Sequence, residues 1–348
     1  MRPTPLAFAF AFAAMGALAA CGEDPTPAMM MTPTPDGGRP PPRECPPGPN
    51  VCECADEGPP DFSRKSDGVA SESSDDVQQQ ALTRTNHWRT AAGLAPLNAN
   101  AQLEQAAVAH SRFMASNAAS CYPGAHNEVS AGCMGFTGAS PAARIMAAGY
   151  RPSLAGEVIN WETTPTRAID GWIWTVYHRT PFQDPSYTEV GFGSVRTART
   201  NNTMEFARRS GQQGQTLTAP SLFPPPGTEG VPTGFQGNLE GPTPPVPLST
   251  GRWPSGAVVS VMFPSNTFTL TTHKLYDGMC REVVHSAFRA ASAPEMEGVQ
   301  ADPSNSNRRF VFLYGDARLQ TNTRYTVELR GTVDGAPWSR VWAFTTAP

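Results

Sequence analysis

Between residues 76 and 178, hydrophobic and small side chains recur at the spacing of amphipathic helices. The first predicted helix runs from Asp76 to Ala92, and Gly93 follows it as a C-terminal cap. Its stripe consists of Val77, Ala81, Thr85, Trp88 and Ala92. A polar face surrounds this stripe, so we expect the helix to pack against a core on one side.

A second helix is predicted after a cap at Asn98 or Asn100. Its buried stripe contains Leu103, Ala107, His110 and Met114. Because His110 falls on this apolar face, we interpret it as a hydrogen-bonded core residue rather than a ligand.

Two further helices have clear start and stop signals. Ser140 and Pro141 begin the third, and Gly149 ends it. Thr164-Pro165 begins the fourth, which buries Ile169, Trp172, Ile173 and Val176. It is expected to end at His178-Arg179-Thr180-Pro181, because proline cannot continue a helix. Strands are predicted at 187–196 and 203–208, with Gly191 and Gly193 permitting a close backbone approach.

The last third of the chain predicts strands only, because it is rich in Val, Thr, Phe, Tyr and Trp. They are expected at 256–263, 267–276, 309–314, 323–333 and 339–345. Short strands separated by Gly, Pro and Asn turns favour a β-sandwich. The predicted fold class is therefore α+β, and His273 and His285 are interpreted as surface residues.

Composition indicates extended segments between folded parts. Only 39% of residues are hydrophobic and 16% are charged, whereas there are 36 prolines. Twelve prolines lie between residues 22 and 60, and ten between 219 and 254. We interpret the first stretch as a tether and the second as a junction between domains. The net charge of −4 argues against a nucleic-acid partner.

The N-terminus has the pattern of an export signal. Arg2 precedes an apolar run from Leu6 to Leu18, which ends in Leu18-Ala19-Ala20-Cys21. This ending resembles a bacterial lipobox and predicts cleavage after residue 20 and lipidation of Cys21; the alternative is an ordinary signal peptide. Gly22 then favours the outer membrane or cell surface. The expected segments are 1–20 signal peptide, 21–75 lipidated tether, 76–212 first domain and 213–348 junction and sandwich.

Six cysteines remain once Cys21 is assigned to the lipid, and export favours disulfides among them. Cys121 and Cys133 bracket a Gly-rich loop and form the preferred pair. Cys45, Cys52 and Cys54 lie too close together for their partners to be chosen, and Cys280 is a candidate partner for one of them.

An ordered set of motifs between residues 76 and 210 resembles the CAP superfamily, which includes cysteine-rich secretory, antigen and pathogenesis-related proteins. The set comprises Asn86-x-x-Arg89, Gly93-Leu94-x-Pro96-Leu97, His110, Ala148-Gly149-Tyr150, Gly156-Glu157, Trp172, His178-Arg179 and Gly191-x-Gly193. This resemblance implies an α-β-α sandwich. Asn322–Thr326, Trp342–Thr346 and the Gly227–Pro232 opening are similar to bacterial Ig-like domains, so an Ig-like sandwich is expected after it.

The CAP resemblance also implies a cleft with two histidines and two acidic residues. Matching motifs place the histidines at His126 and His178 and one acid at Glu157. Candidates for the second acid are Glu128, Glu162 and Asp170. If His126, Glu157 and His178 converge, they supply the ligands of a zinc or other divalent-cation site, or a general acid and base. A hydrogen-bonded network that only fixes the loops is the structural alternative.

These features lead to three functional hypotheses. The first is an exported lipoprotein whose CAP domain binds a lipid or divalent cation, or interacts with another envelope component, without being an enzyme. The second is a hydrolase or peptidase that uses His126, Glu157 and His178. The third is a structural envelope protein with a vestigial site.

Overall fold

The computed structural model describes residues 45–48, 51–58 and 76–348, so the predicted signal peptide and Cys21 lie outside the described residues. Helix α1 (Val77–Ala91) begins at Asp76, and α2 (Ala101–Ser116) begins at Asn100. In both, the capping side chain accepts hydrogen bonds from two backbone N–H groups of the first turn. Within the described part of the chain, no helix combines the length and apolar character needed to cross a membrane.

Helices α3 (Pro141–Ala147) and α4 (Pro165–Ile173) begin at the predicted caps, Ser140 and Thr164. Helix α4 ends earlier than expected, at Ile173, and a short helix α5 (Thr180–Gln183) follows. The intervening turn carries His178 and Arg179 away from the axis of α4. This early end has consequences for the site described below.

The first sheet has the strand order β1-β3-β4-β2. Strands β3 (Glu189–Arg196) and β4 (Thr200–Arg209) correspond to the two predicted strands. Strands β1 (Asn98–Ala99) and β2 (Pro152–Asn160) were not predicted. Strand β2 contains Pro152, Ala155 and Gly156, which are poor strand formers, and pairing with β4 nevertheless holds it extended.

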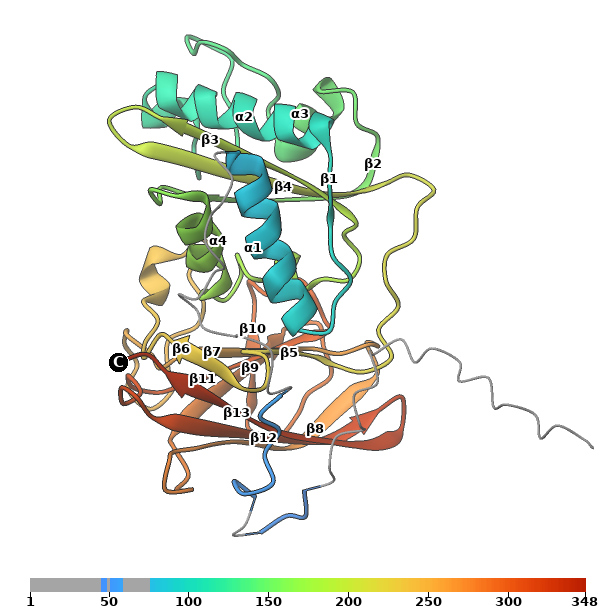
Figure 1. The fold of residues 1–348 in the computed structure, drawn as a ribbon, viewed down its shortest axis with the longest axis vertical. Coiled ribbons are helices and arrows are strands. Elements are labelled where there is room, and N and C mark those ends of the chain that lie inside the picture. The colour runs from blue at the N-terminus through green and yellow to red at the C-terminus, as the bar shows by residue number, and fades with distance from the viewer. Residues whose placement is uncertain (1–44, 49–50, 59–75) are drawn as a thin grey trace, which may run out of the picture. The chain divides into compact units, whose positions relative to one another are not determined.

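Helices cover both faces of this sheet, as the CAP resemblance implied. In Figure 1, α2 and α3 lie on one side of β3 and β4, and α1 and α4 lie on the other. Helix α2 approaches β3 very closely, because a Cβ atom at Gly191 would lie 2.1 Å from the backbone nitrogen of Glu104 and one at Gly193 would lie 2.3 Å from the backbone of Ala107. The predicted close approach at these glycines is therefore confirmed.

Two further sheets pack face to face in the C-terminal part. One has the order β10-β9-β11-β7-β5 and the other β6-β13-β12-β8. The predicted strands correspond to β7 (Val258–Met262), β8 (Phe268–Tyr276), β11 (Phe310–Gly315), β12 (Arg324–Val333) and β13 (Ala336–Thr346). The unpredicted ones are β5 (Ser221–Phe223), β6 (Thr228–Val231), β9 (His285–Ala290) and β10 (Val299–Asp302). The chain is thus α+β, with an all-β sandwich after the CAP-like part.

The first part of the Pro-rich stretch 219–254, which was expected to be a junction between domains, is folded and connects the two cores. It contributes β5 and β6, and Phe223 of β5 joins the apolar core formed by α1 and α4. The buried guanidinium of Arg179 lies 4.3 Å from the centre of the Phe223 ring. Arg179 also donates to Val258 O and Ser260 Oγ, both at 3.0 Å. These contacts join the two cores.

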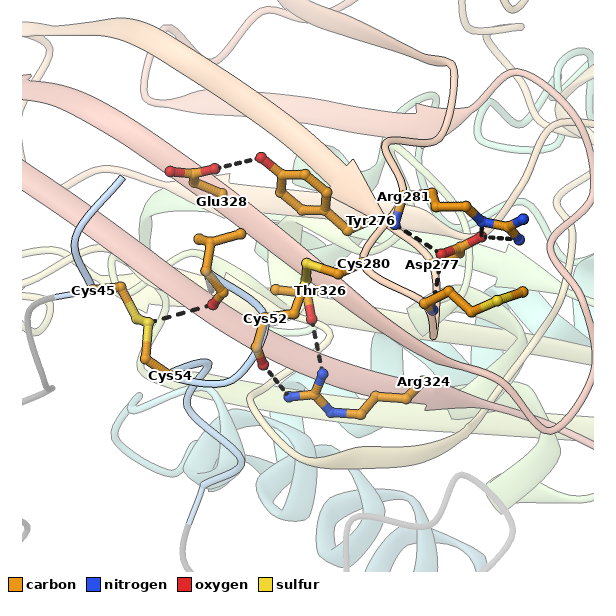
Figure 2. The surroundings of a disulfide bond; sticks show 12 residues. Cys45, Cys52, Cys54, Tyr276, Asp277, Cys280, Arg281, Arg324, Thr326 and Glu328 are labelled. Carbon is orange, nitrogen blue, oxygen red and sulfur yellow. Dashed lines mark hydrogen bonds and ion pairs between the residues drawn. A yellow bond between two sulfur atoms is a disulfide. The ribbon is translucent and has the colours of Figure 1, made fainter. Parts of the chain in front are cut away.

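Part of the predicted tether is also folded. Residues 45–48 and 51–58, here called the strap, pack against the sandwich (Figure 2). Disulfides join Cys45 to Cys54 and Cys52 to Cys280, and a third joins Cys121 to Cys133, the preferred pair. Proline content indicated an extended spacer, but buried Val51 and the two disulfides order this segment.

Candidate functional site

A histidine and a carboxylate from distant parts of the chain meet at one edge of the first sheet. Strand β2 carries Glu157, and the loop between α2 and α3 carries His126. The Nδ1 atom of His126 lies 2.8 Å from Oε1 of Glu157. The His126 side chain is 35% exposed, whereas the Glu157 carboxylate is buried. The structure therefore brings together two of the three residues predicted for the site.

Arg144 of α3 holds both members of this pair. Its Nη2 atom donates to Oε2 of Glu157, and its Nη1 atom donates to the backbone oxygen of His126 at 3.0 Å. Burial alone would raise the pKa of Glu157, but the His126 hydrogen bond and the Arg144 charge outweigh it and hold that pKa well below its usual range. Glu157 is therefore an ionised carboxylate whose two oxygens are both bonded.

Glu205 of β4 lies directly opposite Glu157. It is fully buried, and the Glu157 carboxylate is its hydrogen-bond partner when the Glu205 carboxyl group carries a proton. Its nearest cation is Arg144, whose Nε atom lies 3.9 Å from Oε1 of Glu205. Burial and the negative charge of Glu157 raise the pKa of Glu205 well above its usual range, so this carboxyl group is held in the neutral form.

A second histidine–carboxylate pair lies behind the first. The buried His110 has Nδ1 2.8 Å from Glu128 Oε1 and Nε2 2.9 Å from the backbone oxygen of Ala125. The expectation that His110 is a hydrogen-bonded core residue is confirmed. Because both ring nitrogens face acceptors, the doubly protonated imidazole satisfies both contacts. Burial would raise the pKa of Glu128, but its hydrogen bonds to His110 and Thr137 lower it.

Glu128 also fixes the loop that carries His126. It accepts hydrogen bonds from the backbone nitrogens of Thr137, at 2.7 Å, and Gly138, at 3.3 Å. The disulfide between Cys121 and Cys133 closes the same loop. Asn117 clamps Met134 through two hydrogen bonds of 2.9 Å to its backbone. The loop therefore has a fixed shape, although it contains no strand.

This loop presents apolar side chains to solvent. Val129 is 38% exposed, Met134 69% and Phe136 42%. Between residues 117 and 141 the only Asp, Glu, Lys or Arg is Glu128, which is buried. The loop surface beside His126 is therefore uncharged and partly apolar.

His178 does not join the pair formed by His126 and Glu157, which corrects the predicted convergence. Its Nδ1 atom lies 2.9 Å from Oε1 of Glu240, in the segment between β6 and β7. Glu240 also accepts from the backbone nitrogens of Val176, Tyr177 and His178, at 2.7 to 3.0 Å. The physical reason is the early end of α4, which leaves three N–H groups in the following turn that Glu240 satisfies. His178 thus links the first domain to the sandwich.

The donor set does not fit a metal ion. Among the described residues, no three His, Cys, Asp or Glu side chains come together in a way that could hold one. Both oxygens of Glu157 already accept hydrogen bonds, and the guanidinium of Arg144 already balances the charge of this carboxylate. The predicted ligand set His126, Glu157 and His178 is therefore not assembled.

The three candidates for the second acidic residue have different surroundings. Glu128 belongs to the buried cluster, with Arg144 Nε 3.9 Å from its carboxylate. Asp170 instead binds Arg84 and the indole nitrogen of Trp88. Glu162 has only backbone hydrogen bonds, which involve Asn160 and Asn202.

Sequence reasoning missed Arg144, Glu205 and Glu240. The signal for Glu205 was a lone acid between Met204 and Phe206 in a predicted strand, and Arg144 precedes the buried Ile145 in a short helix. Glu240 lies in a Pro-rich stretch with no periodicity, so its position had no local signal.

The arrangement orients one imidazole. Because Glu157 accepts from Nδ1 of His126, the neutral form of this ring has its lone pair on Nε2. No described residue contacts that Nε2 atom within hydrogen-bonding distance. A carboxylate-oriented imidazole can accept a proton or a hydrogen bond from a ligand.

Comparisons with known proteins show which family part of the sequence matches. The sequence model described as CAP, the cysteine-rich secretory protein family, matches residues 82–207. An extracellular protein containing a SCP domain from Bacillus anthracis str. Ames is 24% identical with a TM-score of 0.31, over 38% of this chain and 40% of that one. An outer surface protein from Borrelia burgdorferi is 15% identical with a TM-score of 0.31, over 39% and 96%.

A cysteine-rich secretory protein from Staphylococcus aureus is 17% identical with a TM-score of 0.30, over 41% of this chain and 42% of that one. The match therefore spans less than half of the Bacillus and Staphylococcus chains. No curated protein matches the chain.

Proposed function

Residues 82–207 of this chain form a CAP domain of the cysteine-rich secretory protein family, and on this basis we propose that the protein is an exported binding module of the cell envelope. One observation carries the proposal. The charged groups of the cluster are buried, and the loop that carries the partly exposed His126 has three exposed apolar side chains and no exposed charged side chain. Such a surface suits contact with a ligand better than bond cleavage.

The chemistry of the loop favours an apolar ligand, such as a lipid, over a divalent cation. Val129, Met134 and Phe136 offer apolar contact area, and His126 adds one hydrogen-bonding edge. A cation would find only one free nitrogen donor at His126, because Arg144 already compensates Glu157.

Lipid binding is tested with the exported protein, its disulfides intact, by calorimetry and by co-sedimentation with phosphatidylglycerol and phosphatidylethanolamine vesicles. Cys21 is replaced by Ser so that an acyl chain does not contribute. We expect Met134→Ser with Phe136→Ser to weaken binding about tenfold or more, given the apolar area removed. Met279→Ser is the matched control, because Met279 is 72% exposed on the sandwich. Equal loss in control and loop variants, or no binding, contradicts the proposal.

Retention at the membrane is proposed to depend on acylated Cys21. The apolar run and the Leu18–Cys21 ending support this, and three disulfides are consistent with an oxidising compartment. Mass spectrometry of the mature N-terminus measures the acyl mass directly. Cys21→Ser is expected to move the protein from the membrane to the soluble fraction, and an unchanged distribution would refute the anchor.

A hydrolase is the second candidate, favoured by the Glu157–His126 contact alone. In that case His126 Nε2 would act as general base on a water, and Glu157 would hold the ring in the required tautomer. Peptide or ester cleavage abolished by both His126→Gln and Glu157→Gln, with the fold intact, would support this candidate over binding.

A further inference from the structure

The strap belongs to the C-terminal sandwich, although it precedes the CAP domain in the chain. Asp56 forms a parallel bridge to Trp342 of β13, next to the short stretch where β6 pairs with that strand. Its N–H donates to Val341 O at 3.0 Å, and its oxygen accepts from Ala343 at 3.1 Å. The Asp56 carboxylate lies 2.6 Å from Arg340. The strap is therefore held to β13 by one strand-like bridge and one ion pair.

Side chains fix the strap at further points. Val51 is 2% exposed and packs in a cluster with Val341 and Ala343. Figure 2 shows Arg324 reaching from β12 to the backbone oxygen of Cys52, at 3.1 Å. Arg330 donates to the backbone oxygen of Cys45 at 2.7 Å. The strap therefore buries apolar surface against the sandwich and accepts hydrogen bonds from two of its arginines. It is an integral part of the sandwich.

The disulfide between Cys52 and Cys280 then closes a covalent ring. The two cysteines are 228 positions apart, and the ring contains the whole CAP domain and strands β5, β6, β7 and β8. Every peptide bond in the CAP domain therefore lies inside this ring. The chain on the N-terminal side of Cys52 is bonded directly to the sandwich.

We infer that the N-terminal anchor holds the sandwich rather than the CAP domain, and that one cleavage between residues 58 and 279 sheds neither domain from the membrane. Hydrolysis of one peptide bond in the ring consumes one water and leaves the disulfide untouched, so both pieces stay joined. Release then requires a second event: another cut, or reduction of the disulfide by a dithiol, which supplies two electrons and two protons. This inference rests on the proposed lipid anchor at Cys21.

The test uses the full chain in membranes, with a C-terminal epitope and a site-specific protease sequence inserted after the exposed Gly211, between the CAP domain and β5. Cleaved membranes are washed in concentrated urea. We expect the C-terminal fragment to sediment with the membranes, and to enter the supernatant only when dithiothreitol is added. In Cys52→Ser with Cys280→Ser, urea alone should release it.

Release of the unsubstituted fragment by urea without a reductant overturns the inference. The lipid anchor is judged separately, by whether the uncleaved chain sediments. If it does not, the anchor fails, and the ring is judged on a non-reducing gel. One band after cleavage supports the ring, and two bands refute it.

Discussion

Glu157 and Glu205 face each other across β2 and β4, and the two cationic or N–H donors of the cluster, Arg144 and His126, bind Glu157 rather than Glu205. Arg144 and His126 both bind Glu157, which leaves the buried Glu205 with a guanidinium 3.9 Å away and a carboxylate beside it. One glutamate of this cluster is therefore ionised and the other is neutral. Substituting each of them in turn should change the free energy of unfolding in different directions.

Glu205→Gln is expected to stabilise the protein by roughly 1–3 kcal/mol near pH 8, because the folded protein keeps Glu205 protonated at a pH where the unfolded chain releases that proton, whereas Gln binds no proton. The pKa of Glu205 is raised in the folded state, first by burial and then by Glu157. The folded state therefore keeps a proton that the unfolded state loses, and stability falls as pH rises above the unfolded pKa of about 4. Urea unfolding from pH 4 to pH 8 measures this slope, which Glu205→Gln should reduce; an unchanged slope would contradict the assignment.

Glu157→Gln is expected to destabilise the protein, in contrast to Glu205→Gln. It leaves buried Arg144 without its main carboxylate, so we expect a loss of about 3–5 kcal/mol at pH 7. The pKa of Glu157 is lowered, so its contribution is present above the unfolded pKa and is lost as pH falls through the folded pKa. Urea unfolding from pH 7 down to about pH 2 measures this loss, because the folded pKa of Glu157 is about 2. A loss no larger than that of an exposed substitution such as Glu295→Gln would show that Arg144 is compensated elsewhere.

Glu240→Ala should weaken the connection between the CAP domain and the sandwich. The substitution removes the acceptor of three backbone N–H groups and of His178, so we expect a loss of about 2–5 kcal/mol. Hydrogen exchange should increase at Val176–His178. Differential scanning calorimetry should show one transition in the unsubstituted protein, because Phe223 joins the two cores. Unchanged exchange in this turn would refute the role given to Glu240.

Removing the ring-closing disulfide should cost more stability than removing the local one in the strap. In the chain-entropy treatment, a loop as long as Cys52–Cys280 contributes about 5 kcal/mol and a short one like Cys45–Cys54 about 3 kcal/mol. The paired Cys→Ala variants are compared by urea unfolding. The reverse order would indicate that the unfolded chain is already compact.

The His273–His285 contact should make the sandwich sensitive to acid. Their rings approach to 3.1 Å between Nδ1 and Nε2, and burial, followed by the charge of His285, lowers the pKa of His273. The protein is therefore most stable above the histidine pKa of the unfolded chain, which is about 6.5. It loses stability as the pH falls toward the lower pKa that His273 has in the folded state. Lys274 adds positive charge nearby, while Glu282 and the Glu297 backbone oxygen oppose it.

His273→Gln should flatten the dependence of melting temperature on pH between about 7 and 5, the range set by an ordinary histidine pKa. The Glu295→Gln variant, exposed on the same sandwich, should keep the slope of the unsubstituted protein. A steep slope that persists in His273→Gln would assign the acid sensitivity to another group.

Local patterns predicted the helices well because each begins with its own cap. Asn100, Ser140 and Thr164 accept hydrogen bonds from the first turn as predicted, and Asp76, predicted as the first residue of its helix, caps that helix in the same way. Strand β2 was missed because its extended backbone depends on pairing with β4 rather than on its own side chains. Propensity therefore explains the helices, while tertiary pairing explains β2.

The site was predictable only in part. Motif order placed His126 and Glu157 together, but the partner of His178 is Glu240, which lies outside the motifs of the resemblance. Cys280 was a candidate partner for one of the three strap cysteines, and the structure pairs it with Cys52. Proline content gave no sign that this disulfide holds the strap against the sandwich.

The strap also constrains the order of assembly during export. Its binding face is made by β12 and β13, and its disulfide partner is Cys280, so these contacts can form only once the last hundred residues of the chain are available. The strap therefore precedes the CAP domain in the sequence but reaches its place after it. In the proposed export, Cys52 lacks its native partner until Cys280 arrives, and correct pairing requires that oxidation be delayed or that wrong pairs be exchanged.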